Sequence, residues 1–151
     1  MSSMIVASAV WAGAAHASCQ TDKVTITGPF GEAQFSIDIV DTPETRAVGL
    51  MNVPEMGRFT GMLFIYDQPQ PTAFWMRNTL IPLDMLFADQ DGVIVKVHEN
   101  AIPLDETPIF GGDAIKYVLE INGGMSAILG IQEGAQMHHP RIQETDDESC
   151  S

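Results

Sequence analysis

Apolar and polar residues alternate at every second position in four stretches of this chain. The clearest covers residues 115–121, and others cover residues 23–27, 33–39 and 93–97. Side chains that repeat every two residues share one face of a strand. We therefore predict a mostly β protein, in which Val93, Val95 and Val97 form the inward face of one strand.

Turn and capping residues divide the chain between these stretches. Residues 28–31 and 89–92 have the composition of tight turns between hairpin strands. Asp41-Thr42-Pro43-Glu44 predicts a short helix that ends at Gly49, and residues 125–129 predict a second that ends at Gly130. The apolar residues 62–66 predict a strand, and the two prolines in residues 67–71 are expected to end it.

Two further strands are expected at residues 72–76 and 84–88, and a long loop is expected at residues 100–112. Seven or eight short strands with two short helices are typical of a closed antiparallel barrel or a two-sheet, jelly-roll-like sandwich. We expect one β domain over residues 18–140, followed by an acidic tail over residues 141–151.

Residues 1–17 carry no charge and end in Ala15-His16-Ala17, the pattern of a secretory signal peptide cleaved near Ala17. The apolar segment has about 12 residues, whereas a membrane-spanning helix needs roughly 20. We therefore expect a periplasmic or secreted protein without stable membrane insertion. The absence of Lys and Arg before this segment departs from the usual leader.

The chain of 151 residues has 7 Lys and Arg against 20 Asp and Glu, a formal net charge of −13. Binding to nucleic acid or to an anionic membrane depends on basic residues, so both are disfavoured. Cys19 and Cys150 are the two cysteines. They could form one disulfide between the ends of the chain or remain two free thiols.

The common catalytic motifs are absent, including the G-x-S-x-G turn, the phosphate-binding loop, C-x-x-C and the zinc motif H-E-x-x-H. We predict no metal site and no cofactor. Trp75, Arg77, Asn78 and Thr79 instead place an aromatic ring beside a guanidinium and an amide, a combination typical of sites for polar small molecules. Alternatively, Arg77 pairs with Asp84 or Glu120 and only joins two strands, while Asn78 and Thr79 satisfy a turn.

Asp84, His98, Glu99 and Glu120 complete the candidate site. Glu99 is in phase with the valines before it, so it either ends a buried face, where its pKa would rise, or reaches solvent. Glu120 lies out of phase with the apolar face of its strand. We expect it on the wetter side of the sheet, lining a cleft or facing water.

The segment Phe74-Trp75-Met76-Arg77-Asn78-Thr79, followed by Pro82-Leu83-Asp84, resembles the central motif of the domain of unknown function 192 family. The segments at residues 46–51, 61–64 and 117–124 resemble further motifs of that family. The resemblance implies a small, often exported, mostly β domain and assigns no catalytic residue. It matches the family at Arg46, Met76, Arg77, Asn78, Thr79, Asp84 and Glu120.

Three hypotheses follow for function. The first is binding of a polar small molecule or cell-envelope component beside Trp75, Arg77, Asn78, Asp84 and Glu120. The second is hydrolysis of an envelope glycan with Asp84, Glu99 or Glu120 as acid and base, which needs two carboxyl groups roughly 5 to 9 Å apart across one cleft. The third is a structural or protein-interaction domain without a pocket. The oligomeric state stays open.

Overall fold

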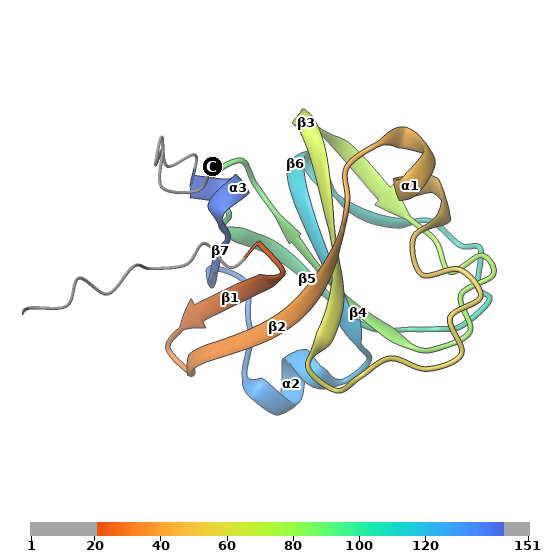
Figure 1. The fold of residues 1–151 in the computed structure, drawn as a ribbon, viewed down its shortest axis with the longest axis horizontal. Coiled ribbons are helices and arrows are strands. Elements are labelled where there is room, and N and C mark those ends of the chain that lie inside the picture. Colours follow the sequence, from red (N-terminus) through yellow and green to blue (C-terminus); the bar gives the residue numbers. More distant parts are fainter. Residues whose placement is uncertain (1–20, 144–151) are drawn as a thin grey trace, which may run out of the picture.

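The computed structural model describes residues 21–143, which form one seven-stranded sheet in the order β5-β4-β6-β3-β2-β1-β7. The sheet curls into a half-barrel with three short helices around it (Figure 1). The elements are β1 (Lys23–Gly28), β2 (Gly31–Val40), α1 (Pro43–Val48), β3 (Thr60–Phe74), β4 (Leu83–Ala88), β5 (Ile94–Ala101), β6 (Ile109–Asn122), α2 (Met125–Leu129), β7 (Gln136–His138) and α3 (Pro140–Gln143).

The prediction of a mostly β fold is confirmed, whereas a closed antiparallel barrel is wrong. Among the described residues, the outer strands β5 and β7 are joined only where β5 begins, by the isolated bridge between Val93 and Gln136 and by backbone hydrogen bonds of Ile94. β7 has three residues, and no ladder joins it to β5. The described strands also form one sheet, so the structure does not show the two-sheet sandwich.

One strand pair is parallel, contrary to the all-antiparallel prediction. β2 pairs with β3 in parallel from the Ser36 and Thr60 partners to the Val40 and Phe64 partners. Two parallel neighbours need a connection that crosses back along the sheet, which no tight turn can supply. Residues 41–59, including α1, make this crossing. They lie over the end of β3 and form one wall of the pocket described below.

α1 begins as its capping residues predict. The Thr42 hydroxyl accepts a hydrogen bond from the Thr45 amide, while the Thr45 hydroxyl accepts one from the Thr42 amide. Pro43 occupies the first turn and Gly49 ends the helix with φ of 48°. These groups satisfy helix ends that would otherwise lack partners. They start α1 directly after β2.

β3 continues through the two prolines that were predicted to end it. Its ladder with β6 shifts register between Ile65 and Ala73, so Pro69 and Pro71 lie in an irregular part of the strand. A proline has no amide hydrogen to donate and is tolerated at such bulges. The expected strands at residues 62–66 and 72–76 are therefore two halves of one strand that ends at Phe74.

The β5 prediction is right in position and wrong in facing at its start. Ile94 is buried and Val95 is 43% exposed, the reverse of the expected inward valine face, whereas Val97 is half-buried and packs against the core as expected. Alternation tells which residues share a face but not which face is covered. β5 is an edge strand, so its packing depends on β4 alone along most of its length. The expected long loop at residues 100–112 shortens to residues 102–108, because both flanking strands extend into it.

Both faces of the central strands are buried. One cluster includes Phe35, Leu63, Tyr117 and Leu119, and a second on the opposite face includes Phe64, Met85, Phe87 and Val118. Alternate residues of β6 thus enter different clusters. This two-sided burial determines the surroundings of Glu120.

None of the helices among residues 21–143 is long and apolar enough to cross a membrane. The predicted signal peptide, Cys19, Cys150 and the acidic residues 144–148 lie outside the described residues.

Gly61→Ala is expected to lower the free energy of unfolding by roughly 1–3 kcal/mol. A Cβ atom at Gly61 would lie 2.5 Å from the backbone oxygen of Glu120, which cannot move without disturbing β6. Denaturant titration would measure the loss. Ser36→Ala, an exposed change on neighbouring β2, is the control and should have little effect. Equal midpoints for the two variants would contradict the prediction.

Candidate functional site

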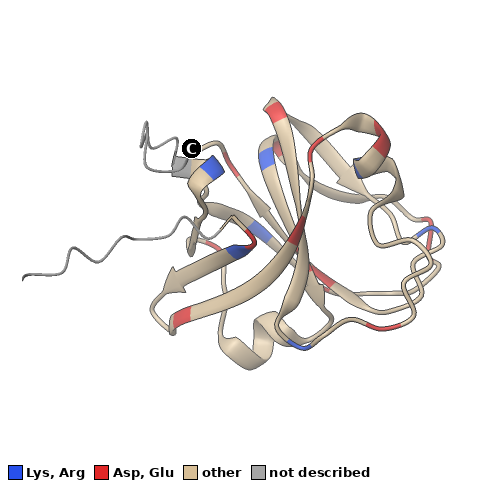
Figure 2. Cartoon of the chain, in the orientation of Figure 1, with Lys and Arg blue, Asp and Glu red and all other residues tan. Residues whose placement is uncertain are grey.

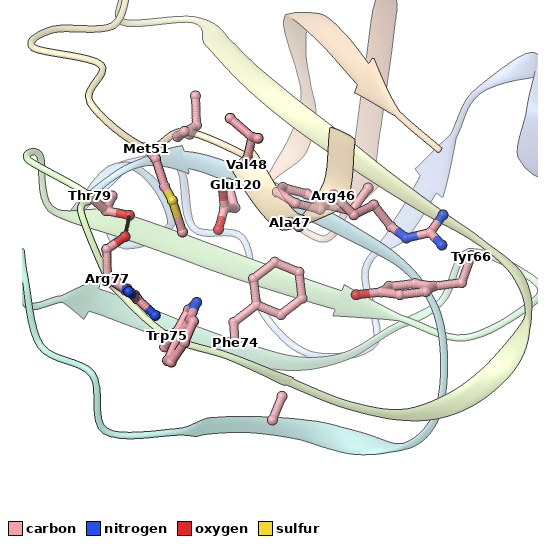
Figure 3. Close-up of a pocket in the computed structure, with 14 residues that line it drawn as sticks. Arg46, Ala47, Val48, Met51, Tyr66, Phe74, Trp75, Arg77, Thr79 and Glu120 are labelled. Atoms are coloured by element: carbon pink, nitrogen blue, oxygen red, sulfur yellow. Dashed lines mark hydrogen bonds between the residues drawn. The ribbon is translucent and has the colours of Figure 1, made fainter. Parts of the chain in front are cut away.

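A pocket of about 200 Å³ opens between α1, the end of β3 and the middle of β6. Its lining combines four aromatic side chains, several small or aliphatic ones, two arginines and one acid (Figure 3). The lining residues are Arg46, Ala47, Val48, Gly49, Leu50, Met51, Phe64, Tyr66, Ala73, Phe74, Trp75, Arg77, Thr79 and Glu120.

Glu120 lies at the centre of this lining. It sits on β6 between Met62 of β3 and Met85 of β4, and only 4% of its surface is exposed. Among the described residues, no hydrogen bond or ion pair involves its carboxyl group. Burial without a partner raises the pKa of Glu120 from its ordinary 4.5 to about 8. At neutral pH the group is therefore a neutral carboxylic acid, which can donate a hydrogen bond.

Of the two alternatives expected for Glu120, it lines a cleft and does not face water, and its side of the sheet is not the wetter one. The second core cluster covers that face of β6, because α1 and residues 49–59 fold over it. A strand pattern read alone assigns the out-of-phase residues to solvent. Here the crossing connection between two distant strands removes that solvent.

Arg46 and Tyr66 form one end of the pocket. The Arg46 guanidinium lies 4.8 Å from the centre of the Tyr66 ring, and its Nη1 donates to the backbone oxygens of Asp41 and Ile65. These contacts hold the guanidinium while leaving its other nitrogens without acceptors among the described residues. Burial, the largest contribution, raises the pKa of Tyr66, and its hydroxyl stays protonated.

Trp75 and Arg77 form the other end (Figure 3). The Arg77 guanidinium lies 5.3 Å from the centre of the Trp75 ring, and its Nε is 3.6 Å from Oε1 of Glu106. Arg77 therefore pairs with neither Asp84 nor Glu120, the two acids considered from the sequence. The side chains of Arg77 and Glu106 are 54% and 61% exposed, and such a surface pair contributes little free energy.

Loops with unusual backbone conformations border the Trp75 end. Asn52, Asn78 and Leu104 have φ of 62°, 53° and 65°, a region that L-residues enter at a cost. The Asn52 amide donates to the backbone oxygen of Asn78, and the Leu104 amide donates to that of Thr79. These two hydrogen bonds join the loop at residues 75–82 to the loops at residues 49–59 and 102–108. The Asn78 side chain is exposed and only approaches the sulfur of Met51, with Nδ2 3.9 Å away.

Asp84 has a different place from the one expected. It is fully buried, and its Oδ1 accepts hydrogen bonds from the Asn100 and Gly124 amides at 2.8 and 2.9 Å. Its Oδ2 accepts from the amide and the hydroxyl of Ser126. These four bonds occupy the carboxylate and join β4, the end of β5 and the start of α2.

His98 and Glu99 line a second hollow of about 450 Å³, which also includes Lys96 and Phe110. Glu99 is exposed. The three acids of the hydrolase hypothesis therefore lie apart: Glu120 in the first pocket, Glu99 in the second and Asp84 in neither. In the described part of the chain, no cleft brings two of these carboxyl groups together.

The family now follows from sequence comparison as well as from the motifs. The DUF192 family (Uncharacterized ACR) matches residues 24–139. The chain belongs to the DUF192 family. No curated protein matches it significantly.

Two crystal structures resemble this DUF192 chain. A protein of unknown function from Novosphingobium aromaticivorans DSM 12444 is 41% identical, with a TM-score of 0.75 over 77% of this chain and 83% of the other. A protein from Sinorhizobium meliloti 1021, for which a role in transcription regulation has been suggested, is 35% identical. Its TM-score is 0.76 over 80% of this chain and 95% of the other.

Of the residues singled out by sequence, the structure brings Trp75, Arg77, Thr79 and Glu120 to one DUF192 pocket. Phe64, Tyr66 and Phe74 also line this pocket but were not predicted as site residues. Arg46 was singled out only because it matches the family motif. The alternation within β3 groups Phe64 with Tyr66. The register pairs Phe64 with Val118, two residues from Glu120, and only the folded pocket brings Phe64, Tyr66 and Glu120 together.

Proposed function

We propose that this DUF192 protein binds a small organic molecule with a polar group in the pocket around Glu120. The carboxyl group of Glu120 carries this proposal. It lines the pocket, only 4% of the residue is exposed, and no described residue forms a hydrogen bond or ion pair with it. No buried side-chain oxygen of the described residues lacks a partner, so the Glu120 oxygens open onto the pocket, where a ligand can bond with them.

The rest of the lining supports the same proposal. Phe64, Tyr66, Phe74 and Trp75 offer apolar ring surface, while the two arginines at the ends offer charged donors. Mostly apolar walls with a few polar groups are typical of small-molecule sites. Strained backbone in the bordering loops, at Asn78 and Leu104, is also common at such sites.

Transcription regulation, suggested for the Sinorhizobium meliloti relative, receives no support from charge. A net charge of −13 repels the phosphate backbone of DNA. Figure 2 shows acidic residues on most elements of the described chain and only a few basic ones.

The binding function can be tested by thermal shift of the purified full chain against small carboxylates, amides, amines and sugars. A ligand at about 100 times its Kd adds about 2.7 kcal/mol, a rise of several degrees in Tm. Ala47→Phe should abolish the shift because Ala47 lies on the pocket rim and is exposed. Ala127→Phe, an exposed change on α2 outside the pocket, is the matched control. A shift that persists in Ala47→Phe would place the ligand elsewhere.

A second candidate function is contact with a protein partner through the joined loops at residues 75–82 and 102–108. Leu80, Ile102 and Leu104 are 46%, 66% and 60% exposed there, and exposed apolar side chains that lie together can mark an interaction surface. This candidate predicts that Leu104→Asp releases a co-purifying protein and leaves the Tm shift of any ligand unchanged.

We also propose export to the periplasm or the medium, on the uncharged residues 1–17 and the Ala15-His16-Ala17 site. Cell fractionation and N-terminal sequencing would test it. A chain in the cytoplasmic fraction that retains residues 1–17 would contradict it.

A further inference from the structure

The charge of the pocket is opposite to that of the whole chain. Its lining includes Arg46 and Arg77, whereas Glu120 is its one acid, and Glu120 carries no charge at neutral pH. The chain as a whole has a formal charge of −13. Two guanidinium groups around a neutral acid favour a negative ligand, and they would repel an ammonium group.

The hydrogen-bonding groups in the pocket are also mostly donors. Protonated Glu120 and Tyr66 each carry an O–H group. Arg46 retains nitrogens without acceptors among the described residues, and Arg77 makes one loose contact to Glu106. A carboxylate accepts several hydrogen bonds and donates none, so it matches this set.

The size of the pocket limits the rest of the ligand. About 200 Å³ is below the roughly 300–1,000 Å³ typical of pockets for drug-sized molecules. The rings of Phe74 and Trp75 flank this space (Figure 3). A single planar ring or a short branched chain fits such walls.

We infer that the ligand is a small organic anion: a carboxylate on one ring-sized apolar body, whose oxygens accept a hydrogen bond from the Glu120 carboxylic acid and pair with the Arg77 guanidinium. This inference rests on the proposed binding function. It makes binding dependent on the proton of Glu120, since two facing carboxylates would repel each other.

The groups that act on the Glu120 proton are few. Arg46 of α1, Tyr66 of β3 and Arg77 after β3 line the same pocket, and Glu106 contacts Arg77 from outside it. The β4 neighbour of Glu120 is Met85, which does not titrate. The pH dependence of binding between pH 7 and 9 should therefore follow Glu120.

The test is calorimetric titration of the full chain with benzoate, benzamide and benzylamine, three single-ring probes of different charge. Benzoate should bind at least tenfold more tightly than benzamide, and benzylamine should give no binding. Because Glu120 loses its proton near pH 8, the benzoate affinity should fall roughly tenfold from pH 7 to pH 9.

Variants separate the two contacts. Glu120→Gln should weaken benzoate binding at pH 7, because an amide is the poorer donor, and should remove the change between pH 7 and 9. Arg77→Gln should weaken binding at least fivefold at both pH values. Arg58→Gln is the matched control, since Arg58 also lies over an aromatic ring, that of Phe59, and lies outside the pocket. It should bind as the unchanged chain does.

Tighter binding of benzylamine than of benzoate, or equal binding of benzamide and benzoate, would overturn the anion inference and leave the binding function standing. Benzoate binding that keeps its pH dependence in Glu120→Gln would overturn the assigned donor. Failure of all three probes to bind a folded chain would count against both the inference and the proposed binding function for single-ring ligands.

Discussion

Replacing Asp84 by alanine is expected to lower the free energy of unfolding by roughly 4 kcal/mol or more, the largest effect of any substitution considered. The change leaves three backbone amides without acceptors: that of Ser126, which is buried, and those of Asn100 and Gly124, which are partly buried. Each unpaired buried group costs about 1–3 kcal/mol. Water cannot easily replace the lost carboxylate, since Asp84 is fully buried.

Denaturant titration and circular dichroism would measure this loss. Asp84→Asn keeps the shape and one oxygen, and about half the loss is expected. Ser126→Ala removes only the hydroxyl bond to Oδ2, and roughly 1–2 kcal/mol is expected. The predicted order of damage is alanine at 84, asparagine at 84, alanine at 126. A loss below about 1 kcal/mol for Asp84→Ala would show that these bonds do not hold the loops.

Glu120→Gln is expected to stabilise the protein increasingly as pH rises. The folded pKa of Glu120 is about 8 and the ordinary value is 4.5. Between these values the folded chain keeps a proton that the unfolded chain has lost, so raising the pH favours unfolding. The slope is about 1.4 kcal/mol per pH unit. Glutamine does not titrate and escapes this penalty.

From pH 5 to pH 8 the stability difference between Glu120→Gln and the unchanged chain should therefore grow by roughly 3–4 kcal/mol. Below pH 4.5 the dependence vanishes, because both states bind the proton. Denaturant titrations at pH 5, 6.5 and 8 would measure it, and the difference between the two chains cancels other titrating groups. Glu32→Gln, on an exposed site of β2, should show no such growth. A constant difference would mean that Glu120 reaches solvent.

Much of the fold was predictable because it depends on neighbours along the chain. The β1 and β2 hairpin, α1 with its Thr42 cap and the strand at residues 115–121 appear where turn, cap and alternation signals place them. The parallel pair of β2 and β3 was not predictable in this way. It depends on how residues 41–59 cross the sheet, and no local pattern encodes that path.

The candidate site was likewise predictable only where it depends on residues that are close in sequence. Trp75, Arg77 and Thr79 are close in sequence, and the pattern alone grouped them. Asp84 belongs to the same segment, yet its carboxylate is turned toward α2 and fully bonded. Local sequence placed these residues near one another but could not tell which side of β4 Asp84 would face.

By itself, the sequence determined the approximate positions of most strands and of two short helices, the acidic charge and the family of this protein, because these depend on residue type and on spacing over a few positions. Only the tertiary structure decided that Glu120 is buried rather than exposed to water, that Arg46 and Tyr66 line the same pocket, and that the sheet forms a half-barrel and not a closed barrel. Those outcomes depend on contacts between β3, β6 and α1, segments up to about 75 residues apart, whose pairing is determined by the packing of the whole sheet.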